Sequence, residues 1–464
     1  MSASLIGVNG TTIATMENPV PVQLTTLSTA ANHVSFSHND ATLDSFERLR
    51  VSEPRVAFEY GFNAATPASA TTIWESTAYG AGTEALTANL YATMLNTTIA
   101  TATGRWIQSY NHVRYAPGIS TMLRFTFNML NHTAVALRQR IGMFTDQGTF
   151  PSTAGDGFYF ENDAGTKNFV IRYMTQGAAG TEDRVAQASW NMDKLNGTGA
   201  SGVNLDWTKS QHLVVEFQYL GVGTIRFGFE TGPAGVVWAH EMHTVNVKAE
   251  AWCRTGSLPV RAECYNYGAS TINSLALINC VVLQEGDVAD FRGWKYFGGD
   301  SGSAAKVGGL VANTWYPVMG IRAAGTNDLT KRARIIPTAI SVTVAVVATG
   351  PVALKVGLLM LATPNTSATF AVTVAGASTV VDNAVAATTV TTGSCIWNAI
   401  VPNVVGTYAF DLKTMNDNAN LIGTAASGTQ AITGAGNLML CAGPMQTATV
   451  GASIVAAINW KEIV

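Results

Sequence analysis

The clearest pattern in the chain is an alternation of large apolar and polar residues between His212 and Glu230. A period of two is typical of a β-strand with one buried face. The alternation stops at Gly221-Val222-Gly223 and then resumes, and glycine can take the positive φ that a tight connection needs. The pattern therefore predicts an antiparallel hairpin whose apolar face must be covered by another layer.

Similar alternation predicts further strands on both sides of this hairpin, most clearly at Met122–Met129. Two other segments are interpreted differently: Glu84–Ile99, rich in Ala, Leu and Met, as a helix, and residues 176–211 as a long loop. Many antiparallel strands separated by Gly, Asp and Asn turns predict a β-sandwich. The other strands predicted in this part are Ile141–Phe144, Gly157–Glu161, Asn168–Met174, Val236–His243, Val260–Tyr267 and Leu275–Gln284.

The sequence changes character near residue 294. Gly298–Ser303 predicts a flexible connector, and beyond it Val, Ala and Thr dominate. The most apolar stretch, Ala339–Leu361, is interrupted by Gly350-Pro351 and Lys355, so it falls short of an unbroken membrane span. A second, smaller β-sandwich is predicted, with strands at Trp315–Arg322, Ile335–Val347, Ala353–Leu361, Thr369–Val374, Ser394–Ile400, Thr407–Leu412, Leu438–Cys441 and Ser453–Trp460.

The predicted fold is all-β: an antiparallel jelly-roll-like β-sandwich at residues 56–293, then the smaller β-sandwich at 294–464. Residues 1–55 are predicted to be an extended N-terminal arm with a docking strand. Asn18-Pro19-Val20-Pro21 favours extended backbone there. In an assembly, such an arm contacts neighbouring subunits.

Charged residues make up only 12% of the chain, about half of the usual share of roughly 25%. A surface covered by neighbouring copies needs little charge, which favours an assembly; a neutral surface of Thr and Ser is the alternative. The net charge of −3 gives no electrostatic signal for nucleic acid. The five cysteines include no C-x-x-C pair and residues 1–15 lack a signal peptide, so we expect folding in a reducing, intracellular environment.

Asp44–Pro54 holds a candidate contact with a neighbouring subunit. Phe46 can dock a short strand, and Arg48 and Arg50 share its other face. The arginines are either solvated on an edge strand or paired with carboxylates of a neighbouring subunit. Phe46, Arg48 and Arg50 are therefore the predicted interface residues.

His240-Glu241-Met242-His243 is the segment that most resembles a metal motif. Its histidines are three apart on a predicted strand, not four apart on a helix as in H-E-x-x-H. His240 and His243 then point to opposite faces, whereas Glu241 and His243 share one. The prediction is a structural Glu–His contact and no metal site.

The sequence contains no recognisable set of catalytic residues. A glycosidase needs two carboxylates facing each other, and nothing in the sequence pairs the acidic residues. Glu161–Gly165 is either a calcium loop or a plain Asx turn, and Ser301 lies in a Gly/Ser linker. The chain is therefore predicted not to be an enzyme and to need no cofactor. The acidic residues considered were Glu161, Asp163, Glu182, Asp183, Asp193 and Asp206, and the tryptophans considered for core packing or sugar stacking were Trp74, Trp106, Trp190, Trp207, Trp238 and Trp252.

Asp44–Pro54 resembles the signature D-x-F-x-R-L-R-V-S-x-P near the N-terminus of certain tailed-bacteriophage virion structural proteins. The resemblance covers roughly residues 44–285, and this region also resembles a laminin-G/concanavalin-like jelly roll. Glu47 and Tyr115-Ala116 depart from the family pattern. Further similar stretches are Tyr115–Gly118, Gln187–Asn191, Asp193–Leu195, Leu220–Gly223, Arg226–Phe229, His240-Glu241 and Leu258–Arg261.

The resemblance implies a non-enzymatic structural component of a phage virion, in the tail, baseplate or an appendage. It would be made in the host cytoplasm and would bind copies of itself and other virion proteins, with neither nucleic acid nor membrane as a partner. A second hypothesis is a host-adhesion module of the tail-fibre type, which would bind surface glycans through exposed Trp or Tyr beside carboxylates. A capsid decoration protein and a glycan-cleaving enzyme on the jelly-roll scaffold are the remaining hypotheses.

Overall fold

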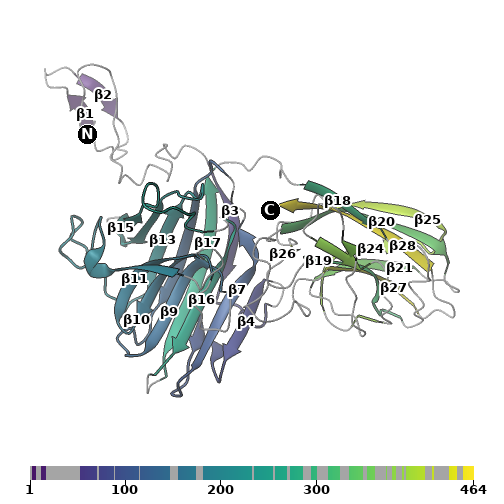
Figure 1. Ribbon diagram of the computed structural model, residues 1–464, viewed down its shortest axis with the longest axis horizontal. Coiled ribbons are helices and arrows are strands. Elements are labelled where there is room, and N and C mark those ends of the chain that lie inside the picture. Colours follow the sequence, from purple (N-terminus) through teal and green to yellow (C-terminus); the bar gives the residue numbers. More distant parts are fainter. Residues whose placement is uncertain are drawn as a thin grey trace.

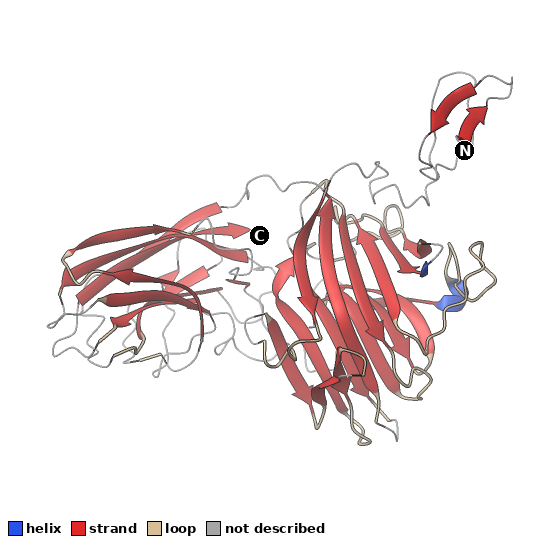
Figure 2. Ribbon diagram, turned by 180° about the vertical axis from the view of Figure 1, so that it is seen from behind, coloured by secondary structure: helices blue, strands red, loops and turns tan. Residues whose placement is uncertain are grey.

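The computed structural model is almost entirely β (Figures 1 and 2). In the part of the chain that it describes, helical structure is limited to short 3₁₀ turns, such as Gln187–Ser189. The described residues are 3–6, 12–16, 53–70, 73–87, 89–113, 115, 117–146, 155–173, 181–232, 235–253, 256–268, 272–285, 294–299, 312–323, 334–347, 353–360, 372–373, 379–382, 389–390, 393–412, 421–422, 438–446 and 453–463.

The first sandwich packs two antiparallel sheets. A seven-stranded sheet has the order β12-β11-β10-β9-β16-β7-β4. Its strands are β4 (Trp74–Tyr79), β7 (Thr103–Val113), β9 (Leu137–Phe144), β10 (Gly157–Asp163), β11 (Thr166–Tyr173), β12 (Thr181–Ala186) and β16 (Leu258–Asn266). An eight-stranded sheet has the order β15-β14-β13-β8-β17-β6-β5, with β3 also paired to β17. Its strands are β3 (Pro54–Gly61), β5 (Thr83–Thr87), β6 (Ala92–Asn96), β8 (Thr121–Asn128), β13 (Gln211–Phe217), β14 (Ile225–Glu230), β15 (Val236–Met242) and β17 (Ser274–Glu285). The jelly-roll-like β-sandwich predicted from the sequence is confirmed.

One aromatic-rich core lies between these sheets. The predicted hairpin is present as β13 and β14, with Leu213 opposite Phe229, and Leu220 and Gly221 take positive φ between the strands. Phe169 of the facing sheet stacks 4.5 Å from Phe227, measured between ring centroids. The alternating apolar residues of the hairpin therefore pack against the seven-stranded sheet, as their pattern predicts.

Two local predictions were wrong. Glu84–Ile99 forms the hairpin β5–β6 instead of a helix, because β6 pairs with β17 and this pairing buries Leu95 completely. Helix propensity is a weak preference that tertiary burial overrides. Residues 176–211 are not one loop, since they contain β12. The alternation in β12 was missed because its residues are mostly polar and no large apolar side chain marks a buried face.

The second sandwich pairs a five-stranded sheet with a six-stranded one. Its predicted strands are present in the described residues, where Thr369–Val374 is represented by Val372–Thr373 alone. Gly298 and Gly299 of the predicted connector belong to a strand, β18, that pairs with β28, and residues 300–303 lie outside the described residues. The core of this sandwich is built mostly from Val, Leu and Ile. The sheets comprise β18 (Trp294–Gly299), β20 (Arg334–Val346), β25 (Gly406–Asp411), β26 (Leu421–Ile422) and β28 (Ser453–Ile463), and β19 (Tyr316–Ala323), β21 (Leu354–Met360), β22 (Val372–Thr373), β23 (Thr379–Asp382), β24 (Ser394–Val401) and β27 (Leu438–Pro444).

The N-terminal segment contains a short antiparallel pair, β1 (Ala3–Ile6) and β2 (Thr12–Met16). The predicted interface residues Phe46, Arg48 and Arg50 lie outside the described residues. The five cysteines lie in the described residues and form no disulfide, and four of them are buried. Across the described ranges, no helix has the length and apolar character to cross a membrane.

Candidate functional site

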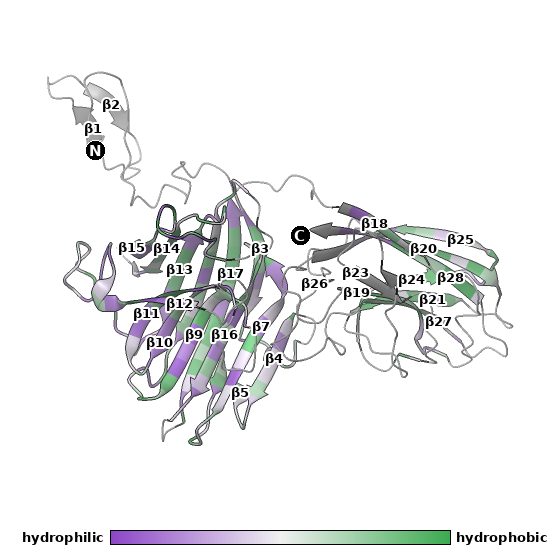
Figure 3. Cartoon of the chain, in the orientation of Figure 1, coloured by the Kyte–Doolittle hydropathy of each residue, from purple (hydrophilic) through white to green (hydrophobic). Residues whose placement is uncertain are grey.

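The candidate site is the outer face of the seven-stranded sheet, meaning the face directed away from the aromatic core. Hydrophilic and hydrophobic segments alternate on these strands (Figure 3). Ile141 and Met143 of β9 belong to the core. Arg138 and Arg140, in the alternating positions of the same strand, therefore lie on the outer face.

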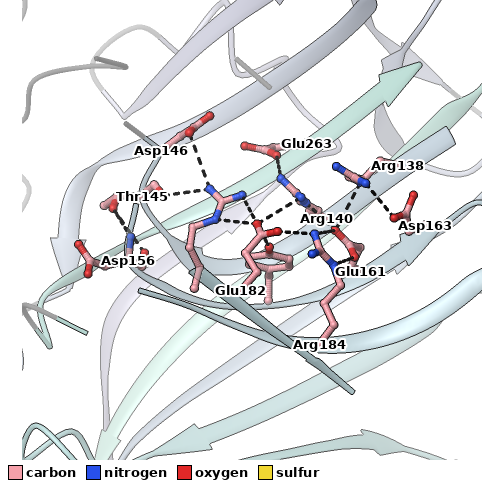
Figure 4. Close-up of polar contacts among 12 residues, drawn as sticks. Arg138, Arg140, Thr145, Asp146, Asp156, Glu161, Asp163, Glu182, Arg184 and Glu263 are labelled. Carbon is pink, nitrogen blue, oxygen red and sulfur yellow. Dashed lines mark hydrogen bonds and ion pairs between the residues drawn. The ribbon is translucent and has the colours of Figure 1, made fainter. Parts of the chain in front are cut away.

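Ten charged residues interact on the outer face, and we call them the charge network; Figure 4 shows part of it. Five are arginines and five are carboxylates, so their formal charges cancel. Most come in pairs two residues apart on one strand, the spacing that places both side chains on the same face. The members are Arg138, Arg140, Arg172, Arg184 and Arg261 with Asp146, Glu161, Asp163, Glu182 and Glu263.

Strand register sets the centre of the charge network. Arg140 of β9 stands opposite Glu263 of β16 on one side and Glu161 of β10 on the other. Opposite charges directly across strands attract one another. Nε of Arg140 lies 2.8 Å from Oε2 of Glu161, and its Nη1 lies 3.4 Å from Oε2 of Glu263. Its Nη2 is 3.4 Å from Oε1 of Glu182, so one buried guanidinium joins three carboxylates.

Arg172 and Arg261 extend the charge network toward Asp146. Nη2 of Arg172 is 2.9 Å from Oε1 of Glu182, and Nη1 of Arg172 is 3.7 Å from Oδ1 of Asp146. Nη2 of Arg261 is 3.3 Å from Oδ2 of Asp146, and its Nε is 2.6 Å from Oε1 of Glu263. The side chains of all five residues are no more than 3% exposed.

Arg138 and Arg184 form the more exposed rim of the charge network. Nη2 of Arg138 lies 2.8 Å from Oδ2 of Asp163. Nε of Arg184 lies 2.9 Å from Oε1 of Glu161, and Arg184 also pairs with Glu182. Glu161 and Glu182, which the sequence could not pair, are therefore brought together through shared arginines.

The aromatic rings around the charge network pack against its guanidinium groups. The guanidinium carbon of Arg261 lies 4.3 Å from the ring centroid of Trp106, and that of Arg140 lies 5.0 Å from Tyr159. The Tyr159 hydroxyl donates a 2.6 Å hydrogen bond to Oε1 of Glu182. Such cation–π contacts and charge-assisted hydrogen bonds help to offset the desolvation of the charges.

The electrostatics keep the glutamates of the charge network ionised. Burial alone would raise the pKa of Glu161, but the guanidinium groups of Arg140 and Arg184 lower it to about 2. The pKa of Glu182 and that of Glu263 are also lowered, because neighbouring arginines outweigh the effect of burial. A catalytic proton donor needs a pKa near the working pH. These three glutamates instead stay ionised and pair with the guanidinium groups of the arginines.

Asp146 differs from the glutamates. Burial raises its pKa, and the attraction of Arg261 and Arg172 only partly opposes this effect. Its carboxylate lies at the end of the charge network nearest to Thr145 and Asp156 (Figure 4). Burial therefore disfavours the ionised form of Asp146, in contrast to the three glutamates.

The predicted Glu–His contact is confirmed at the edge of the other sheet. Nε2 of His243 lies 3.5 Å from Oε1 of Glu241. His240 is directed elsewhere: its Nδ1 accepts a 3.1 Å hydrogen bond from the backbone N–H of Asn191. Burial, reinforced by His243, lowers the pKa of His240 to about 4. Among the described residues no group of three His, Cys, Asp or Glu side chains is placed to hold a metal ion.

Both predictions for Glu161–Gly165, a calcium loop and an Asx turn, were wrong. Glu161 and Asp163 are strand residues of β10, and their carboxylates pair with arginines. Ala164 and Gly165 both take positive φ, as in the tight turns that join antiparallel strands. Asx-type contacts occur instead at Asp193 and Asp206, whose carboxylates accept backbone N–H groups two residues ahead.

The remaining candidates, Asp183 and the tryptophans, contact other side chains of the fold. Asp183 pairs with Lys248 at 2.6 Å. Trp74, Trp190 and Trp252 are buried in the aromatic core, and Trp207 packs partly buried against it. Trp106 and Trp238 are also buried, but they lie outside this core and pack against the guanidinium groups of Arg261 and Arg226.

The sequence matches no established protein family and no curated protein. The similarity to solved structures is confined to the fold. An endo-1,3-β-glucanase from Streptomyces sioyaensis is 11% identical with a TM-score of 0.35, covering 50% of this chain and 97% of the glucanase. The carbohydrate recognition domain of Emp46p is 9% identical with a TM-score of 0.33, covering 49% and 96%. The alginate lyase vAL-1 from Chlorella virus is 9% identical with a TM-score of 0.32, covering 49% and 99%.

These similarities correct one conclusion from the sequence. The prediction that the chain is not an enzyme was wrong as an exclusion, because solved structures with a similar fold include a glucanase and an alginate lyase. The lack of a recognisable catalytic motif does not exclude catalysis on such a sandwich. The similar solved structures also include a carbohydrate recognition domain.

Proposed function

We propose that the chain is a structural component of a tailed-phage virion, in the tail, baseplate or an appendage, and that it assembles as a homo-oligomer. The signature at Asp44–Pro54 supports this proposal, as does the low share of charged residues. Copies of the chain and other virion proteins would be its partners, after synthesis in the host cytoplasm.

The observation that carries the proposal is the composition of the charge network. Its five arginines and five carboxylates form ion pairs across β16, β9, β10, β11 and β12. Charges used in this way hold neighbouring strands together. Ion pairs that link neighbouring strands stabilise the sheet, which suits a virion particle that is exposed to mechanical force.

The proposed contact between subunits is the N-terminal arm, with Phe46 as an apolar anchor and Arg48 and Arg50 as partners for carboxylates of a neighbouring copy. Two arginines on one face offer planar, multidentate donors, which suit carboxylate recognition. Removal of residues 1–55 shortens β3, which begins at Pro54, by two residues. It leaves every other strand of the two sandwiches intact.

Removing residues 1–55 is expected to convert a defined oligomer into monomers. The measurement is the mass in solution of the purified full-length chain and of residues 56–464, by light scattering coupled to size-exclusion chromatography. The double variant Arg48→Ala/Arg50→Ala is expected to weaken the oligomer with the arm still present. A full-length chain that is monomeric at all concentrations contradicts the proposal, as does an oligomer that neither change affects.

A further inference from the structure

A row of side chains crosses one end of the outer face, beyond the charge-network centre. Register places Tyr79 of β4, Gly104 of β7, Tyr265 of β16, Arg138 of β9 and Asp163 of β10 opposite one another in turn. The row spans four strand spacings of about 4.8 Å, roughly 19 Å. It is therefore long enough to contact several units of an extended ligand.

Three tyrosine rings gather over this row. Tyr267 follows Tyr265 by two positions, and their rings stack with centroids 6.2 Å apart. The rings of Tyr79 and Tyr265 meet edge to face at 5.8 Å. They approach across Gly104, which has no side chain between them. A Cβ at Gly104 would lie 2.6 Å from the carbonyl oxygen of Cys264, so a residue with a side chain does not fit at this position without a shift of the backbone.

The polar end of the row adjoins Tyr267. The Tyr267 hydroxyl donates a 2.8 Å hydrogen bond to Oδ1 of Asp163, and the guanidinium carbon of Arg138 lies 5.4 Å from the Tyr267 ring centroid. Nη2 of Arg138 donates to Oδ2 of the same carboxylate. A carboxylate has about four acceptor positions, so Asp163 can accept further hydrogen bonds.

This end of the face is accessible, unlike the centre of the charge network. Tyr267 is 40% exposed, and the side chains of Arg138 and Asp163 are 25% and 24% exposed. The guanidinium of Arg140, one row away, is 1% exposed. Ligands can therefore reach the tyrosines and the Arg138–Asp163 pair, but not the buried ion pairs behind them.

We infer that Tyr79, Tyr265, Tyr267, Arg138 and Asp163 form a shallow binding platform for a neutral polysaccharide. Ring faces of tyrosine pack on the apolar faces of pyranose rings, and each tyrosine carries a hydroxyl for the polar rim of the sugar. The opposite charges of Arg138 and Asp163 cancel, which suits uncharged hydroxyls as ligands. This binding activity goes beyond the proposed structural role and is measured separately from self-association.

The test is affinity electrophoresis of the full-length chain in native gels that contain one polysaccharide each: dextran and a soluble β-glucan as neutral probes, and alginate as an anionic probe. At least one neutral polysaccharide is expected to retard the chain. Tyr267→Ala is expected to weaken the retarding affinity about tenfold, because one stacking surface is lost. Tyr267→Phe keeps the ring and is expected to retain most of the binding.

Tyr91→Ala is the matched control. Tyr91 is 73% exposed and precedes β6 of the other sheet, so its removal is expected to leave the retardation unchanged. Equal thermal unfolding of the two alanine variants excludes a loss of fold. Retardation by neither neutral polysaccharide overturns the inference, and so does retardation by alginate alone or retardation that Tyr267→Ala leaves unchanged.

Discussion

Replacing Arg140 by methionine is expected to lower the free energy of unfolding by about 3 kcal/mol, the lower end of the range for breaking a buried ion pair. Arg140 joins Glu161, Glu182 and Glu263, and its side chain is 1% exposed. Methionine fills a similar volume but leaves the charge network with one uncompensated negative charge. The three glutamates keep other arginine partners, which is why the expected loss stays at the lower end of the range.

The measurement is denaturant unfolding followed by circular dichroism, with Arg124→Met as the matched control. Arg124 also lies on a strand of the first sandwich and pairs with a carboxylate, Glu230, at 2.9 Å. That pair is 29% and 40% exposed, so its loss is expected to cost less than about 1 kcal/mol. Equal losses in the two variants would show that burial of the charge network adds nothing to stability.

Stability is expected to fall as the pH drops from about 4.5 to 2, and Glu161 is expected to contribute roughly 3 kcal/mol of this loss. Its pKa is about 2 in the folded chain, below the ordinary value of 4.5. A lowered carboxyl pKa gives stability that is present above the ordinary value and lost as the pH falls through the folded value. Glu182 and Glu263 act in the same direction.

Asp146 acts with the opposite sign. Its pKa is raised above the ordinary value of 3.8, so its contribution is present at low pH and lost as the pH rises through the folded value. It opposes the three glutamates only in part, and the net expectation is a loss of stability in acid.

The free energy of unfolding of the wild type and of Glu161→Gln, measured between pH 7 and pH 2, tests this expectation. The variant is expected to be less stable at neutral pH and to converge on the wild type near pH 2, because the protonated glutamate resembles glutamine. Glu230→Gln is the control: it makes the same change at an exposed partner of Arg124 and is expected to leave the shape of the profile unchanged. Parallel profiles for wild type and Glu161→Gln would show that Glu161 does not carry the acid sensitivity.

Most of the fold was predictable because large apolar residues alternate along most strands. Phe125 and Phe127 in β8 and Leu213 and Val215 in β13 mark the buried face directly. The prediction failed where this marker was missing, as in the polar strand β12, or where residues with helix propensity are buried by a strand pairing distant in sequence, as at β5–β6. Neither exception can be recognised from the segment alone.

The charge network was not predicted, although a signal for it was present. Arg138 and Arg140, and likewise Arg261 and Glu263, lie two apart within or beside strands that the sequence predicts to be buried. Charges in alternate positions of a buried strand need partners, since an unpaired buried charge is costly. The partners can be chosen only when the strand order is known, because β9 pairs with β16, which is distant in sequence, as well as with the adjacent strand β10.

That strand order has a consequence for synthesis on the ribosome. The end of β9 at Phe144 and the start of β16 at Leu258 are 114 positions apart (258 − 144). At about 5–20 residues per second, β16 follows β9 by roughly 6 to 23 s. During this interval one edge of β9 has no partner strand, and Arg140 lacks the Glu263 carboxylate. We therefore expect a ribosome-bound chain stopped before residue 258 to bind a chaperone that shields strand edges, whereas one stopped after residue 285 already contains every strand of the first sandwich.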